Sequence, residues 1–269
     1  MTKPLHVLSL GAGVQSSTLA LLAAQGKVTP MPDFAVFADT LAEPEGVYRW
    51  LAEIRPQLPF PVHIVSHGNL EKDSIEVVRS KKGHTYLKAG IPAFTTNDTG
   101  DGGMLWRKCT ADYKVMVIRR FIKKRRESKD QPVIQWMGIS LDEVHRMRKS
   151  EVPWMTNRYP LVEDLRWTRH SCLTWWKENG MPAPPRSACV FCPYHSDREW
   201  LRLKDEEPED FARAVRYERD LQAAALRSDA FKETPFLHRS LVTLDKVDLD
   251  PNRDQIDMFG NECEGMCGV

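Results

Sequence analysis

Several features are missing from this 269-residue sequence, and each absence narrows the class of protein. No run of apolar residues approaches the roughly 18 that a membrane-spanning helix needs, so no membrane partner is expected. The first residues lack the apolar core of a signal peptide, which predicts a cytoplasmic protein. Neither sign of charge is in excess, because 38 basic and 37 acidic residues leave a net charge of +1. Any binding of nucleic acid must therefore depend on local clusters of cations.

Internal repeats and low-complexity linkers are also absent. The length of the chain allows one large α/β domain or one domain with an appendage. Strand and helix patterns alternate up to about residue 160, and helical, proline-rich sequence follows. We expect a nucleotide-binding α/β domain over residues 1–160. Residues 161–269 are expected to form a helical, cysteine-rich region with a flexible C-terminal tail.

Residues 7–18 read VLSLGAGVQSST, an apolar strand that enters a turn of small residues and then a helix. Gly11 and Gly13 allow a positive φ and the close approach of a ligand. The helix that opens near Ser16 directs unpaired N–H groups and a positive dipole end toward an anion. No lysine of the Walker type follows, which argues against an ordinary kinase or GTPase loop. The segment therefore predicts a phosphate cradle, with a ligand-free strand-to-helix turn as the alternative.

Two further apolar segments end in polar residues in the same way. Residues 34–38 lead into Asp39 and Thr40, and residues 135–137 lead into Gly138 and a segment that ends at Arg146. In an open parallel sheet, ligands bind outside the carboxyl ends of the strands. We therefore expect a doubly wound, mostly parallel sheet with Ser9, Asp39 and Gly138 at the same edge. The alternative for Asp39 and Thr40 is a helix cap.

The first segment resembles the pyrophosphate loop S-G-G-x-D-S-[ST] of the ATP pyrophosphatase (PP-loop, adenine nucleotide alpha-hydrolase-like) superfamily, with Gln15 where that pattern has Asp. Residues 39–45 are similar to the D-T-G-x-x-x-P-E-T stretch of its phosphoadenylyl-sulfate (PAPS) reductase branch, and residues 138–146 to the G-x-R-x-x-[ED]-S-x-x-R segment of that branch. The resemblance implies an adenine nucleotide, ATP or PAPS, bound with Mg²⁺. The implied nucleotide contacts are Ser9, Gly11, Gly13, Gln15, Ser16, Ser17, Asp39, Thr40, Gly138 and Arg146.

Six cysteines in a chain without a secretion signal favour metal or redox chemistry over structural disulfides. Cys189 and Cys192 form a C-x-x-C-P turn whose spacing lets both thiolates reach one metal or cluster. Cys109 lies upstream, and Cys172 lies close enough in sequence to fold back on the turn. These four residues are the predicted metal set, with Cys263 in place of Cys172, or Cys172 as a buried apolar thiol, as alternatives.

Four thiolates at this spacing do not by themselves distinguish zinc from an iron-sulfur cluster. The layout of the cysteines resembles that of iron-sulfur adenylyl-sulfate reductases, although one cysteine stands where they have a pair. That resemblance implies a 4Fe-4S cluster, with zinc as the alternative. In the tail, Cys263 and Cys267 stand among glycines and read as a mobile arm that carries thiols into the site. Together with Asp39, they are the predicted catalytic residues.

Residues 119–126 contain six cations, which could meet the phosphates of a polynucleotide or form a solvated helical face. Of the eight tryptophans, Trp106, Trp167, Trp175 and Trp176 flank the cysteines, where they could stack on bases, although core packing is the commoner role. Residues 97–103 read as a mobile loop, for which a lid over the site is expected.

Three functions are compatible with these residues. The first is an ATP-dependent sulfurtransferase that adenylates an acceptor, such as nucleic acid, releases pyrophosphate, and transfers sulfur from a cysteine persulfide or a cluster. Under this hypothesis the chain resembles the DNA phosphorothioation and tRNA thiolation enzymes in architecture, and a sulfur donor such as a cysteine desulfurase is implied. The second is a PAPS or adenylyl-sulfate reductase with a thioredoxin-like reductant. The third is a non-catalytic nucleotide sensor on the same fold.

Overall fold

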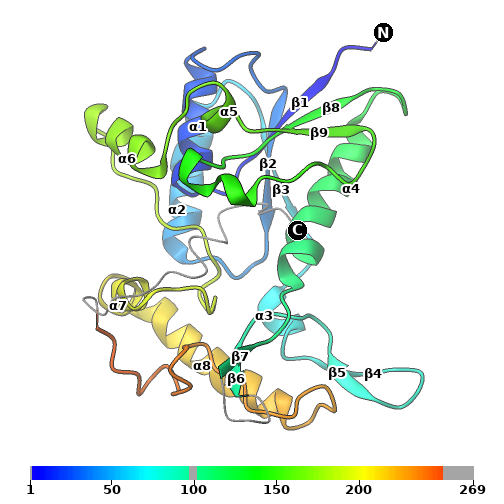
Figure 1. The fold of residues 1–269 in the computed structure, drawn as a ribbon, viewed down its shortest axis with the longest axis vertical. Coiled ribbons are helices and arrows are strands. Elements are labelled where there is room, and N and C mark those ends of the chain that lie inside the picture. Colours follow the sequence, from blue (N-terminus) through cyan, green and yellow to red (C-terminus); the bar gives the residue numbers. More distant parts are fainter. Residues whose placement is uncertain (1, 97–101, 251–269) are drawn as a thin grey trace.

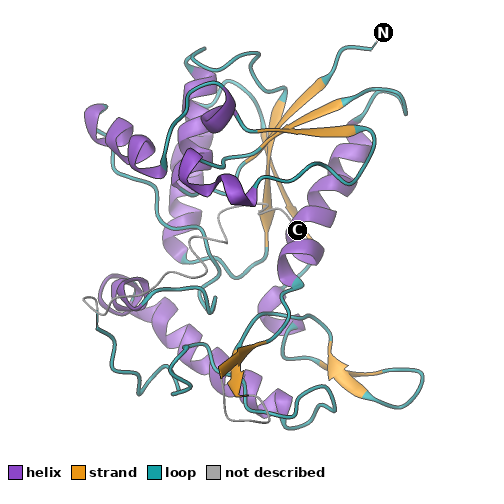
Figure 2. Cartoon of the chain, viewed as in Figure 1, coloured by secondary structure: helices purple, strands orange, loops and turns teal. Residues whose placement is uncertain are grey.

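The computed structural model describes residues 2–96 and 102–250 of the chain. Its centre is a five-stranded parallel sheet in the order β3-β2-β1-β8-β9 (Figures 1 and 2). The strands are β1 (Leu5–Ser9), β2 (Phe34–Asp39), β3 (Val62–Ser66), β8 (Val133–Trp136) and β9 (Met155–Arg158). The expected α/β architecture with a parallel sheet is therefore confirmed.

Helices cover both faces of this sheet, because alternate side chains of each buried strand point to opposite sides. One face packs against α1 (Val14–Ala24), α2 (Glu45–Ile54) and α6 (Arg169–Glu178), and its core includes Leu8 and Phe37. The other face packs against α4 (Met116–Arg125), with Val7 and Val36 in that core (Figure 1). The sheet is thus buried on both sides.

The order of the strands reverses direction at β1. From β1 the chain proceeds to β2 and β3 on one side, and later to β8 and β9 on the other. Gln135 of β8 donates a hydrogen bond to Ser9 of β1 across this point, from its Nε2 to the serine Oγ at 2.6 Å. A reversal of this kind leaves a crevice at the carboxyl ends of the two strands, which is where open α/β sheets bind ligands.

A second lobe lies below the sheet in Figure 1. It is built from the long connection between β3 and β8 and from the segments after α6. Its elements are α3 (Leu70–Asp73), the hairpins β4 (Val77–Arg79) with β5 (Thr85–Leu87) and β6 (Phe94–Thr96) with β7 (Gly102–Met104), α7 (Asp197–Glu206) and α8 (Pro208–Ala225). The β3–β8 connection and the segments after α6 share one core, which includes Leu70, Tyr113, Trp200 and Tyr217. Residues on both sides of the boundary expected at residue 160 therefore share a core.

The remaining described elements are short. They are the 3-10 helices at Arg55–Gln57 and η3 (Leu141–Arg146), the π-helix η2 (Thr110–Val115), and α5 (Pro160–Glu163). The π-helix runs directly into α4. It carries Lys114 toward the carboxyl edge of the sheet, where it joins the site.

Candidate functional site

The turn between β1 and α1 has the shape expected of a phosphate loop, although its strained residue differs from the expected one. The left-handed residue is Ala12, at φ +61, whereas the sequence favoured Gly11 and Gly13 for that conformation. An alanine held there costs about 1 kcal/mol. Gly13 caps α1 with extended backbone and no side-chain cap, so no side chain satisfies the first N–H groups of the helix. The helix end is therefore available to an anion.

Gly138 lies directly against this helix end. A Cβ atom at Gly138 would stand 2.8 Å from both the backbone N and the Cα of Ser16, so no side chain fits there. The turn after β8 and the loop after β1 are thus in backbone contact. This contact brings two of the three segments that the sequence singled out to one edge of the sheet.

The hydroxyl groups of the loop are hydrogen-bonded within the protein. Ser16 Oγ donates to the Gly13 carbonyl oxygen at 3.3 Å, and Ser17 Oγ accepts from Trp50 Nε1 at 3.0 Å. Ser17 is fully buried. An anion at the loop would therefore meet backbone N–H groups more than the serine hydroxyls that the sequence suggested.

Gln15 takes a different place from the one expected for a nucleotide contact. Its side chain is fully buried, and its Nε2 donates to Glu143 Oε2 at 3.1 Å, while its Oε1 accepts from Arg169 Nη1 at 2.8 Å. Glu143 in turn accepts from Arg146 Nη1 at 2.5 Å. Gln15 therefore connects α1 to η3 and α6 and holds two guanidinium groups near the loop. Arg146 itself is buried and paired with Glu143.

Asp39 ends β2, and only one of its two carboxylate oxygens forms hydrogen bonds with the described residues. Its Oδ1 accepts from the Leu41 backbone N–H at 2.8 Å and from the Tyr48 hydroxyl at 2.9 Å. Burial and the hydrogen bond to Asp39 raise the pKa of Tyr48, so this tyrosine stays a neutral donor. Both bonds use the same oxygen, and Oδ2 has no hydrogen bond to the described residues. That oxygen is a suitable ligand for Mg²⁺, which prefers carboxylates and phosphates.

A buried ion pair links this edge to the π-helix. Lys114 Nζ donates to Glu43 Oε1 at 3.2 Å, with the lysine side chain 9% exposed and the glutamate side chain 1% exposed. The second oxygen of Glu43 is buried and has no hydrogen-bond partner in the described part of the chain. A buried carboxylate oxygen without a partner costs free energy, which makes it a candidate contact for a ligand or water.

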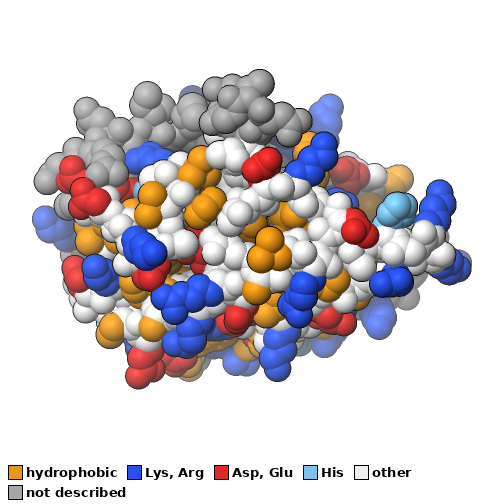
Figure 3. All heavy atoms as spheres, turned by 90° about the horizontal axis from the view of Figure 1, so that it is seen from below, with side chains coloured by type: hydrophobic (Ala, Val, Ile, Leu, Met, Phe, Trp, Pro, Cys, Tyr) orange, Lys and Arg blue, Asp and Glu red, His pale blue; other side chains and the backbone are white. Residues whose placement is uncertain are grey.

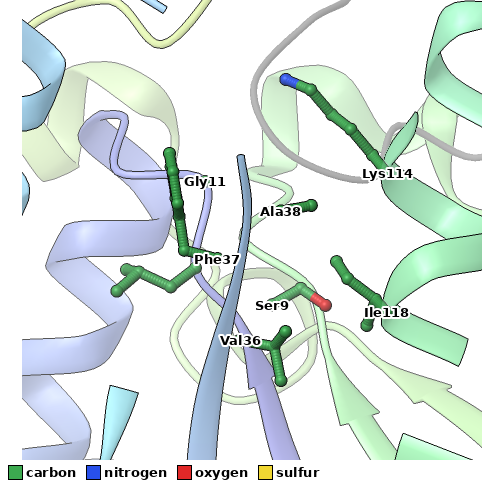
Figure 4. Close-up of a pocket in the computed structure, with 8 residues that line it drawn as sticks. Ser9, Gly11, Val36, Phe37, Ala38, Lys114 and Ile118 are labelled. Carbon is green, nitrogen blue, oxygen red and sulfur yellow. The ribbon is translucent and has the colours of Figure 1, made fainter. Parts of the chain in front are cut away.

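Lys114 also lines two adjoining pockets. The strand-end pocket is lined by Ser9, Leu10, Gly11, Val36, Ala38 and Lys114, among others, and Figure 4 shows the lysine side chain extending from its helix toward the space beyond the strand ends. The cysteine pocket is lined by Thr40, Ile91, Cys109, Lys114, Cys189 and Cys192, among others. One buried cation thus faces both the phosphate loop and the thiols.

The cysteine pocket gathers three of the four predicted metal ligands. Cys189 and Cys192 are buried and Cys109 is half-buried. The Cys189 sulfur lies 3.4 Å from the Thr40 hydroxyl, so the thiols reach the end of β2. His195 Nε2 hydrogen-bonds the Cys189 carbonyl oxygen at 3.0 Å and fixes the C-x-x-C turn, while burial lowers the pKa of His195 and keeps it neutral.

Cys172 lies elsewhere. It is fully buried on α6, in the core that includes Trp175, Trp176 and Leu19, and it does not line the cysteine pocket. These neighbours are typical of a buried apolar thiol, which was the alternative to a role for Cys172 as a metal ligand. Within residues 2–96 and 102–250, no group of three or more His, Cys, Asp or Glu side chains is arranged to hold a metal ion. The tail residues Cys263 and Cys267 lie outside the described residues.

Three of the cations in the basic segment 119–126 contact protein groups, and one of them is Arg125, whose guanidinium lies over the Phe121 ring. Arg119 pairs with Glu151 at 2.8 Å, and the Arg126 guanidinium stacks over Trp154 and donates to the Gln131 carbonyl oxygen. Of the tryptophans near the cysteines, Trp175 and Trp176 are core residues, whereas Trp106 is 82% exposed.

Lys114 and Glu43 were not singled out from the sequence. A lysine that directly follows a phosphate-loop glycine signals its role in the sequence. Lys114 lies about a hundred residues from the loop and reaches it only through the fold. Glu43 stands inside the segment that resembles the reductase pattern, which was the available signal.

The chain matches no model of a known protein family and no protein of curated function. No helix in the described part of the chain is both long and apolar enough to cross a membrane. The geometry of the site is therefore the ground for assigning a function.

Proposed function

We propose that this chain is an ATP-dependent sulfurtransferase of the adenine nucleotide alpha-hydrolase-like type, which activates an acceptor as its adenylate and replaces AMP with sulfur. The observation that carries the proposal is the position of Lys114. It lines both the strand-end pocket beside the phosphate loop and the pocket of three thiols. Activation by a nucleotide and attack by sulfur require these two sites to be contiguous.

In this proposal the phosphates of ATP lie on the backbone N–H groups at the start of α1, where the helix dipole favours negative charge. Asp39 Oδ2 ligates the Mg²⁺ that accompanies the nucleotide. The Lys114 ammonium faces the α-phosphate, where charge develops as pyrophosphate leaves.

The reaction has two stages. An acceptor oxygen attacks the α-phosphorus of ATP, and the bond to pyrophosphate breaks. The terminal sulfur of a cysteine persulfide then attacks the activated carbon, the C–O bond breaks, and AMP departs with the oxygen. A second thiol attacks the resulting disulfide and releases the thiolated acceptor, which leaves two cysteines joined by a disulfide. A thioredoxin-like reductant restores them, and a cysteine desulfurase supplies the next sulfur.

A metal or cluster fits the described residues only in part. Cys109, Cys189 and Cys192 line one pocket, but they are not arranged as a metal site and Cys172 is not among them. If a 4Fe-4S cluster or zinc binds, these three thiolates would hold it with a fourth ligand from outside the described residues. A bound cluster would supply sulfide or electrons, and no step above depends on it.

The test measures pyrophosphate release from ATP, and in parallel sulfite release from PAPS with a thiol reductant. We expect pyrophosphate release, stimulated by an acceptor, and no sulfite. In Lys114→Met, release should fall by about two orders of magnitude or more, as for the loss of one electrostatic group in an active site. Lys177→Met, on the exposed face of α6, is the matched control.

Sulfite release without pyrophosphate release would replace this proposal with the reductase. Nucleotide binding with neither product, in the presence of acceptor and sulfur donor, would leave only the sensor. Lys114→Met at the wild-type rate would remove the observation on which the proposal rests.

A further inference from the structure

An open groove borders the cysteine pocket in the second lobe. Its volume is about 530 Å³, and it is lined by Tyr86, Lys88, Ile91, Trp106, Lys108 and Phe231, among others. Ile91 also lines the cysteine pocket, and Lys108 directly precedes Cys109. The groove and the cysteine pocket therefore adjoin at Ile91.

Two aromatic side chains in this groove are exposed. Trp106 is 82% exposed and Tyr86 is 45% exposed. Tryptophan is highly buried on average, so an indole in water at the rim of a groove is a feature that calls for a partner. A third ring, Phe231, is half-buried on the same groove.

Two cations, Lys88 and Lys108, line the groove, and others stand on the hairpin that contributes Tyr86. Lys108 is exposed in the groove itself, and Arg79, Lys81 and Lys82 stand exposed on the adjoining β4–β5 hairpin. No described carboxylate forms an ion pair with any of these four. Lys88 differs, because it pairs with Asp73 and Glu76 at 2.9 Å each, and Asp112 is the acidic residue in the lining. In Figure 3, Lys and Arg side chains gather at the right-hand end of this face, where the hairpin projects.

We infer that this groove binds a single-stranded nucleic acid and is the acceptor site of the proposed sulfurtransferase. Exposed rings beside unpaired cations are the combination that recognises unstacked bases and their phosphates, and it is sequence-tolerant. A protein partner that covered this groove would instead leave several of these cations without an opposite charge. The inference rests on the proposed function for the role of acceptor, while strand binding is measured separately.

The experiment titrates full-length protein into fluorescein-labelled single strands of one sequence, as DNA and as RNA, and into the corresponding duplex, and follows anisotropy. We expect either single strand to bind more tightly than the duplex. Trp106→Ala should weaken single-strand binding about tenfold or more, whereas Trp106→Tyr keeps a stacking surface and most of the affinity. Leu226→Ala, 87% exposed and outside the groove lining, is the control.

Salt provides a second readout. Lys108→Ala should reduce the slope of log affinity against log salt by about 0.7, the value for one phosphate contact on a single strand. The better-bound of the DNA and RNA strands is the one to add as acceptor in the pyrophosphate assay.

Equal affinity of Trp106→Ala and wild type, or no binding of either single strand, would overturn the inference. ATP binding is measured on the same samples without oligonucleotide. If ATP binds and the strands do not, the groove assignment fails alone. If the strands bind through Trp106 and ATP does not bind, the groove stands and the proposed function fails.

Discussion

Single atoms decide whether the phosphate loop can form, and Gly138 is the clearest case. We expect Gly138→Ala to push its Cβ into the backbone of Ser16 and to destabilise the protein by about 1 to 3 kcal/mol, as other overpacked sites do. Nucleotide affinity should fall with it, because the displaced atoms belong to the helix end. Denaturant unfolding and calorimetric titration measure the two effects. Gly102→Ala is the control, since a Cβ there meets nothing within 4 Å.

His6 predicts a pH dependence of stability. Burial lowers its pKa, and its Nδ1 accepts a hydrogen bond from Trp136 Nε1 at 3.2 Å, which requires the neutral ring. Below about pH 6.5 the unfolded chain takes up a proton that the folded chain resists, so stability contributed by neutral His6 is present above that pH and declines below it.

The measurement compares wild type with His6→Gln by denaturant unfolding from pH 8 down to pH 5. The difference in their free energies of unfolding should narrow as the pH falls. His84→Gln, on the exposed hairpin tip, controls for the loss of a histidine. A difference that widens toward low pH would contradict the assignment.

Some of these residues were accessible from sequence and others were not. Ser9, Asp39 and Gly138 could be placed because a residue that ends a buried strand lies at the sheet edge whatever the packing around it. Gln15 and Cys172 could not, because the direction of a side chain on a helix face depends on what packs there. For Cys172, closeness in sequence to Cys189 did not imply closeness in space.

Among the elements, α6 offers a test of the cysteine assignments. Because Cys172 lies in the core between α1 and α6, we expect Cys172→Ala to lower the free energy of unfolding by about 1 kcal/mol, the loss of a small buried group. Iron or zinc content should not change in this variant. Cys189→Ala should abolish any bound metal, measured by elemental analysis of anaerobically purified protein.

Loss of metal in Cys172→Ala together with unchanged folding would restore Cys172 as a ligand. Cys263→Ser completes the set, because it removes the alternative fourth ligand. If metal survives in Cys172→Ala and is lost in Cys263→Ser, the tail is a ligand and not a mobile catalytic arm.

The strand-to-helix units could be predicted from the sequence because each is encoded within about twenty residues. The π-helix was not. The π-helix places Lys114 at the site and Tyr113 in the core of the second lobe. Its formation depends on packing between the sheet and residues far along the chain. The groove beside β5 was likewise hidden, although Trp106 was among the residues noted.

For the whole molecule, binding of ATP with Mg²⁺ should raise the free energy of unfolding by about 2.7 kcal/mol at a concentration one hundred times the Kd. Asp39→Asn removes the carboxylate proposed to ligate Mg²⁺ and should abolish most of this gain, while leaving the stability of the unliganded protein nearly unchanged. Denaturant midpoints with and without ATP and Mg²⁺ measure both. Equal stabilisation of Asp39→Asn and wild type would exclude Asp39 from the site.

The parallel sheet and the described thiols of the cysteine pocket belong to different parts of the chain. None of these three cysteines lies on a strand of the sheet, because Cys109 comes from the connection between β3 and β8, and Cys189 and Cys192 come from the segment after α6. The cysteines could therefore be exchanged, lost or multiplied without altering a single strand pairing. Natural variation in this chain should then conserve the proposed nucleotide site while changing the chemistry beside it. An engineer could replace the proposed thiol chemistry by rebuilding two connections.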